Sequence, residues 1–408
     1  MKHNTIFSPA EILLPKDHID LTKWAVVACD QFTASPSYWA ECETIIGSSP
    51  SAYHYILPEA YLGTEKEKTH AAKITASMKQ FDKTAMKRFD GILYLERNLP
   101  NGAVRHGMIG KIDLEAYDYS AGSNSPVRAT EATVLERIPP RCKVRSEAVV
   151  ELPHILILIN DRMGILSSLS EKKAELLPLY DFDLMQGGGH ASGYGVSGKA
   201  LECLMERIAA YESSTHGVVY AMGDGNHSLA AAKAHYENLK ARLGEAAANH
   251  PARYALCEVT ALGDESLVFE PIYRVMQNCD PADVAAELGK ITEKGNGTQE
   301  ITMLMGEKEE TVHFTAPSHA LTVGTLQNFI DDYIKAHPTV KCDYIHGEET
   351  LRSLSHEADT VGFLFDGMDK SELFPYVEQH GTLPRKTFSM GEAESKRYYL
   401  EMREIVKL

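Results

Sequence analysis

The stretch Val218-Val-Tyr-Ala-Met-Gly-Asp-Gly-Asn-His-Ser228 decides the fold that we expect for this 408-residue chain. Its first five residues are apolar, which predicts a short buried strand. The alanine-rich segment that begins at Leu229 predicts a helix. Gly223 and Gly225 lie between the two and allow a tight turn, with close approach of the backbone to another group. The sequence therefore predicts a strand–turn–helix unit here.

The same turn is the strongest candidate for a binding site. The first amides of a helix have no intrahelical acceptor, and the helix dipole favours negative charge at that end. Asp224 would orient His227 or hold a cation, and His227 would carry a proton near neutral pH. The alternative is a structural turn that Asp224 or Asn226 caps. The candidate phosphate ligands in this turn are Gly223, Gly225, Asn226 and Ser228.

A second polar stretch runs from Arg128 to Arg141. If residues 127–134 form a strand, Glu131 and Thr133 share one face. Glu131 would then act as a base or a magnesium ligand, with Thr133 lining the same pocket. Guanidinium groups match phosphate geometry, and the alternative is an edge strand with exposed ion pairs. The candidate arginines are Arg128, Arg137 and Arg141.

A third polar motif is Tyr180-Asp-Phe-Asp183, which precedes a glycine-rich stretch at residues 186–198. On a strand, Asp181 and Asp183 point the same way, as paired ligands for a hard cation would. The alternative is a solvated strand face. The glycine-rich stretch has neither helical nor strand periodicity, which predicts a mobile loop. Such a loop would serve as a lid or as a plain connector, and the lid residues would be Gly187, Gly188 and Gly189.

Two further loops are candidate parts of the site. Asp30, Gln31 and Thr33 follow the apolar strand expected at residues 24–29, where open α/β sheets place ligand-binding loops. The neighbouring Tyr38 and Trp39 would line that site or belong to the core. In the other loop, the cations Arg385 and Lys386 precede a helix that the capping box Ser389 to Glu392 predicts, an arrangement that favours an anion. The alternative for this loop is a basic surface turn.

The composition narrows the class of protein. The formal net charge is −16, and no run of lysines and arginines offers the basic face that nucleic-acid binding requires. We expect no nucleic-acid or membrane partner, although a local pocket can still attract a small anion. The seven cysteines are dispersed and never in C-x-x-C spacing, which fits a reducing compartment. No signal-peptide run is present, so we expect a cytoplasmic location.

The order of the expected elements indicates a mixed α/β protein. Strands do not strictly alternate with helices, so a regular doubly wound fold is not expected. With 408 residues the chain is long enough for at least two domains. We expect a main domain at residues 1–290, which carries the phosphate site. A smaller α/β domain at 291–408 would pack back on that site through residues 384–393.

Several long motifs together resemble the family called domain of unknown function 1015, over nearly the whole chain. They are ACDQFT at 28–33, VRATEATVLERIPPR at 127–141, PHI at 153–155, YDFDLMQGGG at 180–189, GDGNHSLAAAKA at 223–234, FEPIYR at 269–274 and PRKTFSMGEA at 384–393. More remotely, the turn at 223–228 is similar to the D-G-x-H-R turn of the ParB-like/sulfiredoxin superfamily. The matching residues are Asp224, Gly225 and His227, while Ser228 stands in the arginine position. A guanidinium would then have to come from Arg137, Arg141 or Arg385.

The remote resemblance implies a ParB-like strand–turn–helix core and phosphate binding by the turn. Some relatives bind or hydrolyse nucleotides and some phosphorylate free serine, so it implies ATP or ADP, magnesium, and serine or phosphoserine. It also places Glu131 and Thr133 in the family's E-x-T pattern. A ParB-like nucleic-acid binder is a third reading, which the charge of −16 disfavours.

The candidate residues and the family resemblance together predict an enzyme that transfers or hydrolyses a phosphoryl group of a small metabolite or nucleotide. Its catalytic residues would be Glu131, Asp224 and His227. The alternative is a regulatory protein that binds such a ligand without consuming it. The sequence contains no H-E-x-x-H, no G-x-S-x-G and no G-x-G-x-x-G in a strand–helix context. We expect no haem, flavin or zinc. The sequence does not decide between a monomer and a homodimer.

Overall fold

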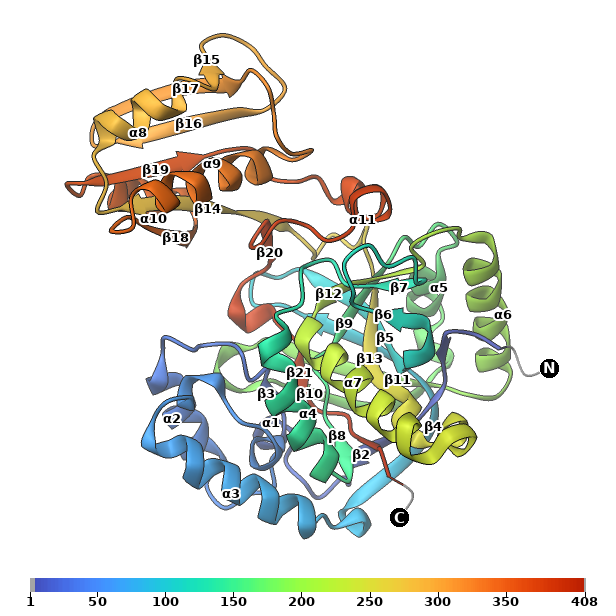
Figure 1. Ribbon diagram of the computed structural model, residues 1–408. Coiled ribbons are helices and arrows are strands. Elements are labelled where there is room, and N and C mark those ends of the chain that lie inside the picture. The colour runs from blue at the N-terminus through green and yellow to red at the C-terminus, as the bar shows by residue number, and fades with distance from the viewer. Residues whose placement is uncertain (1–3, 407–408) are drawn as a thin grey trace. The chain divides into compact units, whose positions relative to one another are not determined.

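The computed structural model describes residues 4–406 of the chain. It contains two compact units (Figure 1). Unit 1 comprises Met1–Leu267, Val377–Thr382 and Glu392–Leu408, and unit 2 comprises Val268–Tyr376 and Leu383–Gly391. The division therefore falls before Val268 rather than at the expected residue 291. The segment from Glu392 onward belongs to unit 1, not to the smaller domain.

Unit 1 is built on an 11-stranded mixed sheet. Its main path is β10 (Leu177–Asp183), β11 (His190–Val196), β4 (Met86–Asn98), β5 (Val104–Asp113), β13 (Tyr254–Ala261), β9 (Leu156–Ile159), β12 (Tyr220–Asp224), β7 (Val127–Arg128) and β6 (Tyr117–Asp118). The strands β1 (Phe7–Ser8) and β2 (Ala10–Pro15) pair with β5 and β4. The pairs β13–β9, β12–β7 and β6–β7 are parallel and the other pairs of this sheet are antiparallel. This arrangement confirms the mixed α/β class.

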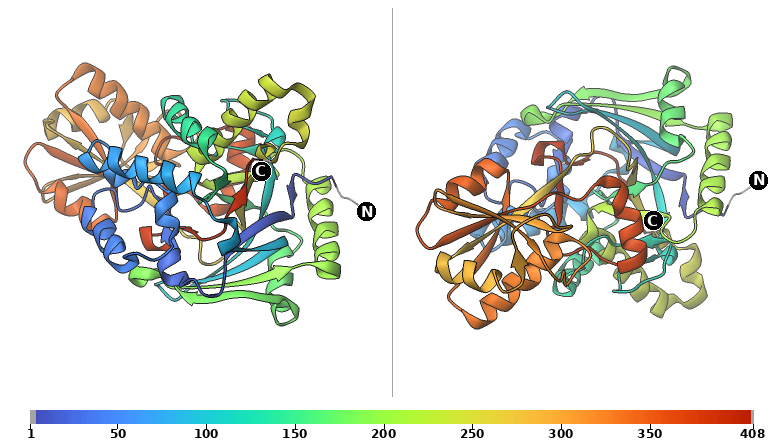
Figure 2. Two further views of the ribbon diagram at one scale, coloured as in Figure 1. Left: turned by 90° about the horizontal axis from the view of Figure 1, so that it is seen from below. Right: turned by 90° about the horizontal axis from the view of Figure 1, so that it is seen from above.

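Both faces of this sheet are covered, because strand side chains alternate between its two sides. On β4, Leu93 and Leu95 belong to one hydrophobic cluster and Ile92 and Tyr94 to another. Figure 2 shows helices from the two clusters on opposite sides of the strands. The helices of unit 1 are α1 (Leu21–Trp24), α2 (Pro36–Ile46), α3 (Glu65–Lys79), α4 (Ile138–Glu147), α5 (Ile165–Glu171), α6 (Gly198–Ser214) and α7 (Asn226–Leu243).

Short strand pairs attach two segments of low sequence number to the last part of the chain. In the first pair, β3 (Val26–Val27) is antiparallel to β21 (Tyr398–Tyr399). In the second, β8 (Val150–Glu151) is antiparallel to β22 (Arg403–Glu404). These pairs bring residues 396–403 into the core of unit 1.

Unit 2 is a smaller α/β body with its own sheet. The sheet contains β15 (Thr292–Glu293), β17 (Lys308–Phe314), β16 (Glu300–Met305), β19 (Thr360–Leu364), β14 (Phe269–Gln277), β18 (Lys341–His346) and β20 (Phe388–Met390). Its helices are α8 (Pro281–Leu288), α9 (Thr322–Ala336) and α10 (Glu348–Ser355), and α11 (Leu373–His380) crosses the division between the units. Within residues 4–406, no helix has the length and apolar character needed to cross a membrane.

Three local predictions were wrong. The glycine-rich stretch at 186–198 is not a loop, because residues 190–196 form β11 between β10 and β4. The helix expected from Ser389 is absent, because residues 388–390 form β20, where Phe388 stacks on Phe269 with ring centroids 3.9 Å apart. The strand expected at 127–134 is regular only at Val127–Arg128. In each case tertiary contacts override local sequence preference.

The glycines of β11 explain why its strand pattern is weak in the sequence. A Cβ atom at Gly195 would lie 2.6 Å from Cε2 of Phe89, and one at Gly193 would overlap the ring of Tyr180. Aromatic rings from the neighbouring strands therefore cover the places where β11 has no side chains. Glycine is required here by close packing rather than by a turn.

We predict that Gly195→Ala lowers the free energy of unfolding by about 1–3 kcal/mol, because the new methyl group overpacks the sheet against Phe89. Chemical denaturation followed by circular dichroism measures the change. Gly263→Ala is the matched control, since a Cβ there meets open space and the backbone has no positive φ. Equal stability of the two variants would contradict the packing argument.

Candidate functional site

The predicted strand–turn–helix unit is present, and Gly225 forms its turn. Strand β12 ends at Asp224 and helix α7 begins at Asn226. Gly225 has φ 78° and ψ 26°, and a Cβ atom there would lie 3.0 Å from Cα of Ile155. No side chain of the described residues caps the N-terminus of α7. The first amides of an 18-residue helix are thus left for another acceptor.

Asp224 is held at the edge of this turn by two donors. Its Oδ1 accepts from the Gly225 amide at 2.8 Å, and its Oδ2 lies 3.5 Å from Nζ of Lys396. Burial opposes ionisation, but Lys396, His154 and the Gly225 amide together lower the pKa of Asp224. Asp224 is therefore an anion at neutral pH, and Lys396 is a cation beside it.

His227 is a neutral hydrogen-bond acceptor in this structure. The Val134 amide donates to its Nε2 at 3.2 Å. Burial, reinforced by the positive charges of Arg137 and Arg141, lowers the pKa of His227 to about 4. Arg137 directly precedes α4 and Arg141 lies in its first turn, and α4 packs beside α7 (Figure 1). The environment that keeps His227 uncharged therefore contains two positive charges.

The segment that contains Glu131 lies against the same turn. The Asn226 side-chain amide donates to the Glu131 carbonyl at 3.0 Å and to Oγ1 of Thr133 at 3.4 Å. The amide oxygen of Asn226 is buried and has no hydrogen-bond partner among the described residues. The structure thus brings Glu131 and Thr133 to the turn, through Asn226 rather than along a strand.

A chain of polar contacts begins at the loop after β3. Nε2 of His154 lies 4.0 Å from Oδ1 of Asp30, and Nδ1 of His154 is 2.6 Å from the Tyr399 hydroxyl. That hydroxyl donates to Sγ of Cys29 at 3.1 Å. Burial and the charge of Asp30 raise the pKa of Cys29 to about 12, so the thiol is protonated and is not a nucleophile. The negative charge of Asp30 also acts on His227. It raises the pKa of His227 and so opposes the effect of Arg137 and Arg141.

Of the other candidate residues in this loop, Gln31 contacts Asp30 and Trp39, whereas Thr33 is exposed. Nε2 of Gln31 donates to Oδ1 of Asp30 at 3.1 Å, and the Gln31 carbonyl accepts from Nε1 of Trp39. Trp39 is fully buried, so it is a core residue. Thr33 is exposed.

Arg141 forms an ion pair with Glu59, whose backbone amide donates to the Cys29 carbonyl at 2.7 Å.

Several predicted ligands have other contacts in their own unit. Arg128 is buried, and its Nε donates to the Ser125 carbonyl at 2.8 Å. Gly187 and Gly188 form a short helical turn, and Gly189 precedes β11. The Gly188 carbonyl accepts from Arg97 at 3.2 Å, so this segment is packed rather than mobile. Arg385 and Lys386 belong to unit 2, where Arg385 pairs with Asp331 at 2.5 Å.

Asp181 and Asp183 share a strand face, as the sequence predicted, and His190 joins them. Nδ1 of His190 is 2.7 Å from Asp183, and Nε2 contacts Asp181. Hydrogen bonds to Asp183 and then Asp181 raise the pKa of His190 against burial, which favours the charged ring between the two carboxylates. Five strands (β11, β4, β5, β13 and β9) separate β10 from β12 in the sheet. As magnesium ligands these aspartates stay a prediction, separate from the turn.

Magnesium, which the resemblance implies, fits the turn only with help from a substrate. Within residues 4–406, no three or more His, Cys, Asp or Glu side chains are grouped to hold a metal ion. Magnesium is commonly bound by one or two carboxylates, with waters and substrate phosphates completing its octahedron. Asp224 and Asp30, which both face His154, would supply those carboxylates.

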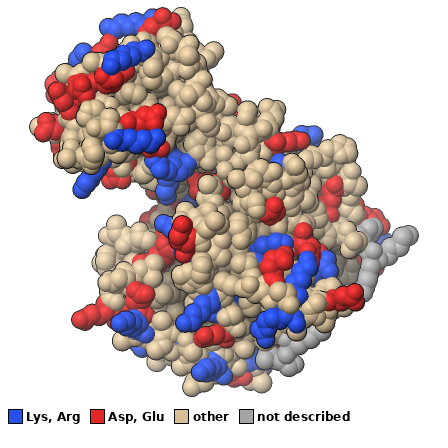
Figure 3. Space-filling view, in the orientation of Figure 1, with Lys and Arg blue, Asp and Glu red and all other residues tan. Residues whose placement is uncertain are grey.

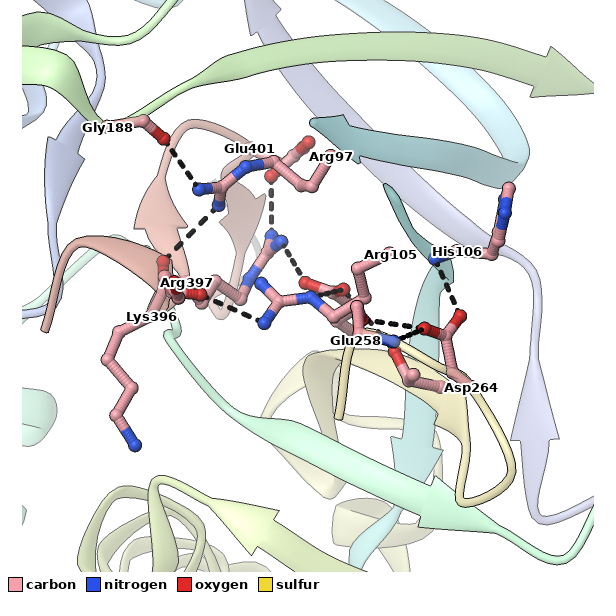
Figure 4. Close-up of polar contacts among 12 residues, drawn as sticks. Arg97, Arg105, His106, Gly188, Glu258, Asp264, Lys396, Arg397 and Glu401 are labelled. Atoms are coloured by element: carbon pink, nitrogen blue, oxygen red, sulfur yellow. Dashed lines mark hydrogen bonds and ion pairs between the residues drawn. The ribbon is translucent and has the colours of Figure 1, made fainter. Parts of the chain in front are cut away.

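A buried arginine cluster, defined here as Arg97, Arg105 and Arg397, positions the segment that carries Lys396 (Figure 4). Arg397 pairs with Glu258 at 2.8 Å and Glu401 at 2.5 Å. Arg97 donates to the Lys396 carbonyl at 3.3 Å. These contacts fix the backbone on both sides of Lys396. Its ammonium group is thereby directed to Asp224.

The sequence interpretation missed Lys396, Glu59 and Tyr399, the hydrogen-bond partner of His154. Lys396 and Tyr399 lie more than 165 residues after the turn, and local motifs do not connect positions so far apart. The sequence indicated Cys29 and His154 only through the family resemblance, because both residues lie in motifs that carry it.

Together the features define a mixed α/β protein in which helix α7 begins without a side-chain cap, beside Asp224. The chain belongs to the family described as Protein of unknown function (DUF1015), whose model matches residues 10–335. A comparison with curated proteins finds no match.

Solved structures with a similar fold are distant in sequence. A free serine kinase in complex with AMP is 11% identical, with a TM-score of 0.38 over 72% of this chain and 90% of that one. SbnI from Staphylococcus aureus, with a C-terminal truncation, is 11% identical, with a TM-score of 0.37 over 71% and 85%. A conserved hypothetical protein from Pyrococcus furiosus is 11% identical, with a TM-score of 0.36 over 72% and 94%. At these values the function has to be argued from the site itself.

We predict that the His227 imidazole titrates with a midpoint of about 4, because burial, Arg137 and Arg141 disfavour its charged form. Histidine-selective NMR as a function of pH measures the midpoint. Arg137→Gln removes a cation, so the midpoint should rise in that variant, whereas Lys199→Gln on the exposed surface of α6 should leave it unchanged. A midpoint near the ordinary value of about 6.5 in the wild type would contradict the assigned environment.

We also predict that Arg397→Met lowers the free energy of unfolding by about 3–5 kcal/mol, because it leaves buried carboxylates unpaired. The side chains of Glu258 and Glu401 are each 1% exposed. Arg88→Met is the control, since Arg88 pairs only with exposed carboxylates and should cost about 1 kcal/mol or less. Urea denaturation compares them, and similar losses in both variants would show that the cluster does not organise this segment.

Proposed function

We propose that unit 1 binds the phosphoryl group of a small metabolite or nucleotide at the N-terminus of α7 and transfers or hydrolyses it. The observation that carries the proposal is an uncapped helix N-terminus beside Lys396, Arg137 and Arg141, with ionised Asp224 next to it. Free amides and cations stabilise phosphate oxygens, and a neighbouring carboxylate can accept a proton.

We call the proposed anion site the anion seat. Three groups form it: the first amides of α7, Lys396, and the pair Arg137 and Arg141. The first amides of α7 offer hydrogen-bond donors with fixed directions, because Gly225 sets the direction of the helix. Lys396 is 15% exposed at its side chain, so its charge is poorly screened by water. Arg137 and Arg141 add positive potential from α4. A phosphoryl group here would be held by both dipoles and charges, as phosphoryl transfer requires.

The carboxylates supply the proton acceptor. In the proposed step, an oxygen of water or of an acceptor hydroxyl attacks phosphorus. The bond to the leaving oxygen breaks, and the proton of the attacking oxygen passes to a carboxylate. Asp224 and Glu131 are the candidates, because both residues belong to segments in contact with the turn. Magnesium, when bound, would neutralise charge on the phosphate oxygens.

His227 has a different role in this scheme. It is uncharged at neutral pH and accepts from the Val134 amide. A bound phosphate would raise its pKa, because an adjacent negative charge favours the imidazolium. His227 would then donate a proton to the phosphate or to the leaving oxygen.

The expected outcome of Asp224→Asn and of Glu131→Gln is a loss of about 100-fold or more in kcat, because each removes a proton acceptor or charge at the reacting group. Phosphoserine, ATP and ADP are the first compounds to test, with and without magnesium, by thermal shift and by ³¹P NMR of the products. Lys199→Gln is the control variant and should retain full activity. Lys396→Met should mainly weaken binding.

The outcomes separate the two readings of the site. Turnover that Asp224→Asn and Glu131→Gln leave intact would sink the catalytic assignment. A ligand that raises the melting temperature without being consumed, and loses this effect in Lys396→Met, would instead identify a regulatory binding protein. If no phosphorylated compound binds in a way that depends on Lys396, the proposed anion seat itself is wrong.

A further inference from the structure

A pocket lies in unit 1 between helix α4 and the second half of helix α7. Its volume is about 460 Å³, which suits a small organic ligand. Figure 3 views the molecule in the orientation of Figure 1, where α4 and α7 lie on the side facing the reader. The walls include Lys143 and Ser146 from α4 and His235, Asn238 and Arg242 from α7.

The charges that line this pocket all have one sign. Lys143 and Arg242 are its charged side chains, and its lining contains no aspartate or glutamate. Neither cation forms an ion pair within the described part of the chain. In a protein with a net charge of −16, two cations without carboxylate partners that face one pocket mark a local positive site.

His235 adds a ring with two nitrogens to the wall of this pocket. Its side chain lines the pocket, and the residue is 8% exposed. Burial, and then the charges of Arg145, His250 and Arg242 against that of Glu151, lower the pKa of His235 to about 4. A hydrogen-bond acceptor in the pocket would contact this ring.

The rest of the lining indicates what kind of anion fits. Pro139 and Leu239 provide an apolar wall, and Ser146 and Asn238 provide a hydroxyl and an amide. A bare inorganic ion would leave the apolar wall exposed to water, whereas an anion with an apolar body would cover it. The lining therefore matches a molecule with one phosphate or carboxylate group and a small apolar portion.

We propose that the pocket between α4 and α7 is a second binding site, which takes a small organic anion through Lys143, Arg242 and His235. This site is distinct from the turn at Asp224, because none of its lining residues belongs to that turn. Its ligand is a separate molecule from the phosphorylated substrate proposed above. The proposal does not depend on that substrate.

Phenyl phosphate is the probe for this site, with inorganic phosphate and phenol as its two halves. Isothermal titration at pH 7 measures affinity, and histidine-selective NMR reports where the probe binds. We expect phenyl phosphate to bind more tightly than either half and to shift the His235 resonances. We also expect the probe to raise the titration midpoint of His235 from about 4, because an anion favours the charged ring.

The variant Lys143→Gln/Arg242→Gln should weaken binding about tenfold or more, since it removes two charge-assisted contacts. Both positions are exposed, so the variant should fold normally. The control Lys68→Gln/Lys199→Gln removes two exposed lysines on α3 and α6 and should bind like the wild type. Equal affinity in the two double variants, or His235 resonances that do not move at saturation, would overturn the proposal.

Binding at the turn is distinguished within the same experiment. A probe at the turn shifts the His227 resonances and is lost in Lys396→Met. A probe in the second pocket shifts His235 and is retained in Lys396→Met. If only His227 responds, the second site is wrong while the anion seat at the turn stands; if only His235 responds, the second site stands alone.

Discussion

The left-handed backbone at Gly225 is the constraint on which the site depends. It turns the chain from β12 into α7 within one residue, directly over the backbone of Ile155, where a side chain has no room. The turn leaves the first helix amides without a cap and fixes Asp224 through its own backbone hydrogen bond. The anion site that we propose and the placement of the Asp224 carboxylate both depend on this geometry.

A second constraint comes from the buried charge of the core. Arg397 is 4% exposed at its side chain and joins Glu258 to Glu401. Buried ion pairs contribute little net stability but impose a unique arrangement when every partner must be satisfied. Here the arrangement fixes the strand that delivers Lys396 and Tyr399. The segment that carries Lys396 is thus held by buried side chains from distant parts of the chain.

The sequence predicted the local parts of this structure better than the distant ones. The turn at 223–228 was predictable because an apolar strand, two glycines and an alanine-rich helix follow one another directly. The contribution of Lys396 was not predictable, since it depends on strand pairing with residues 26–27. Strand β11 was missed because its glycines make room for rings of Tyr180 and Phe89, a reason that lies in three dimensions. The local pattern therefore predicted the strand–turn–helix unit but not the charged residues that other segments bring to it.

The most direct test of the anion seat is a ¹H–¹⁵N NMR titration of the wild-type protein with inorganic phosphate. Hydrogen bonding to a phosphate oxygen shifts amide protons strongly, so the backbone amides of Asn226 and His227 should move first and furthest. The account predicts that these two shifts saturate together with one dissociation constant. It is contradicted if these amides stay in place while phosphate binds elsewhere on unit 1.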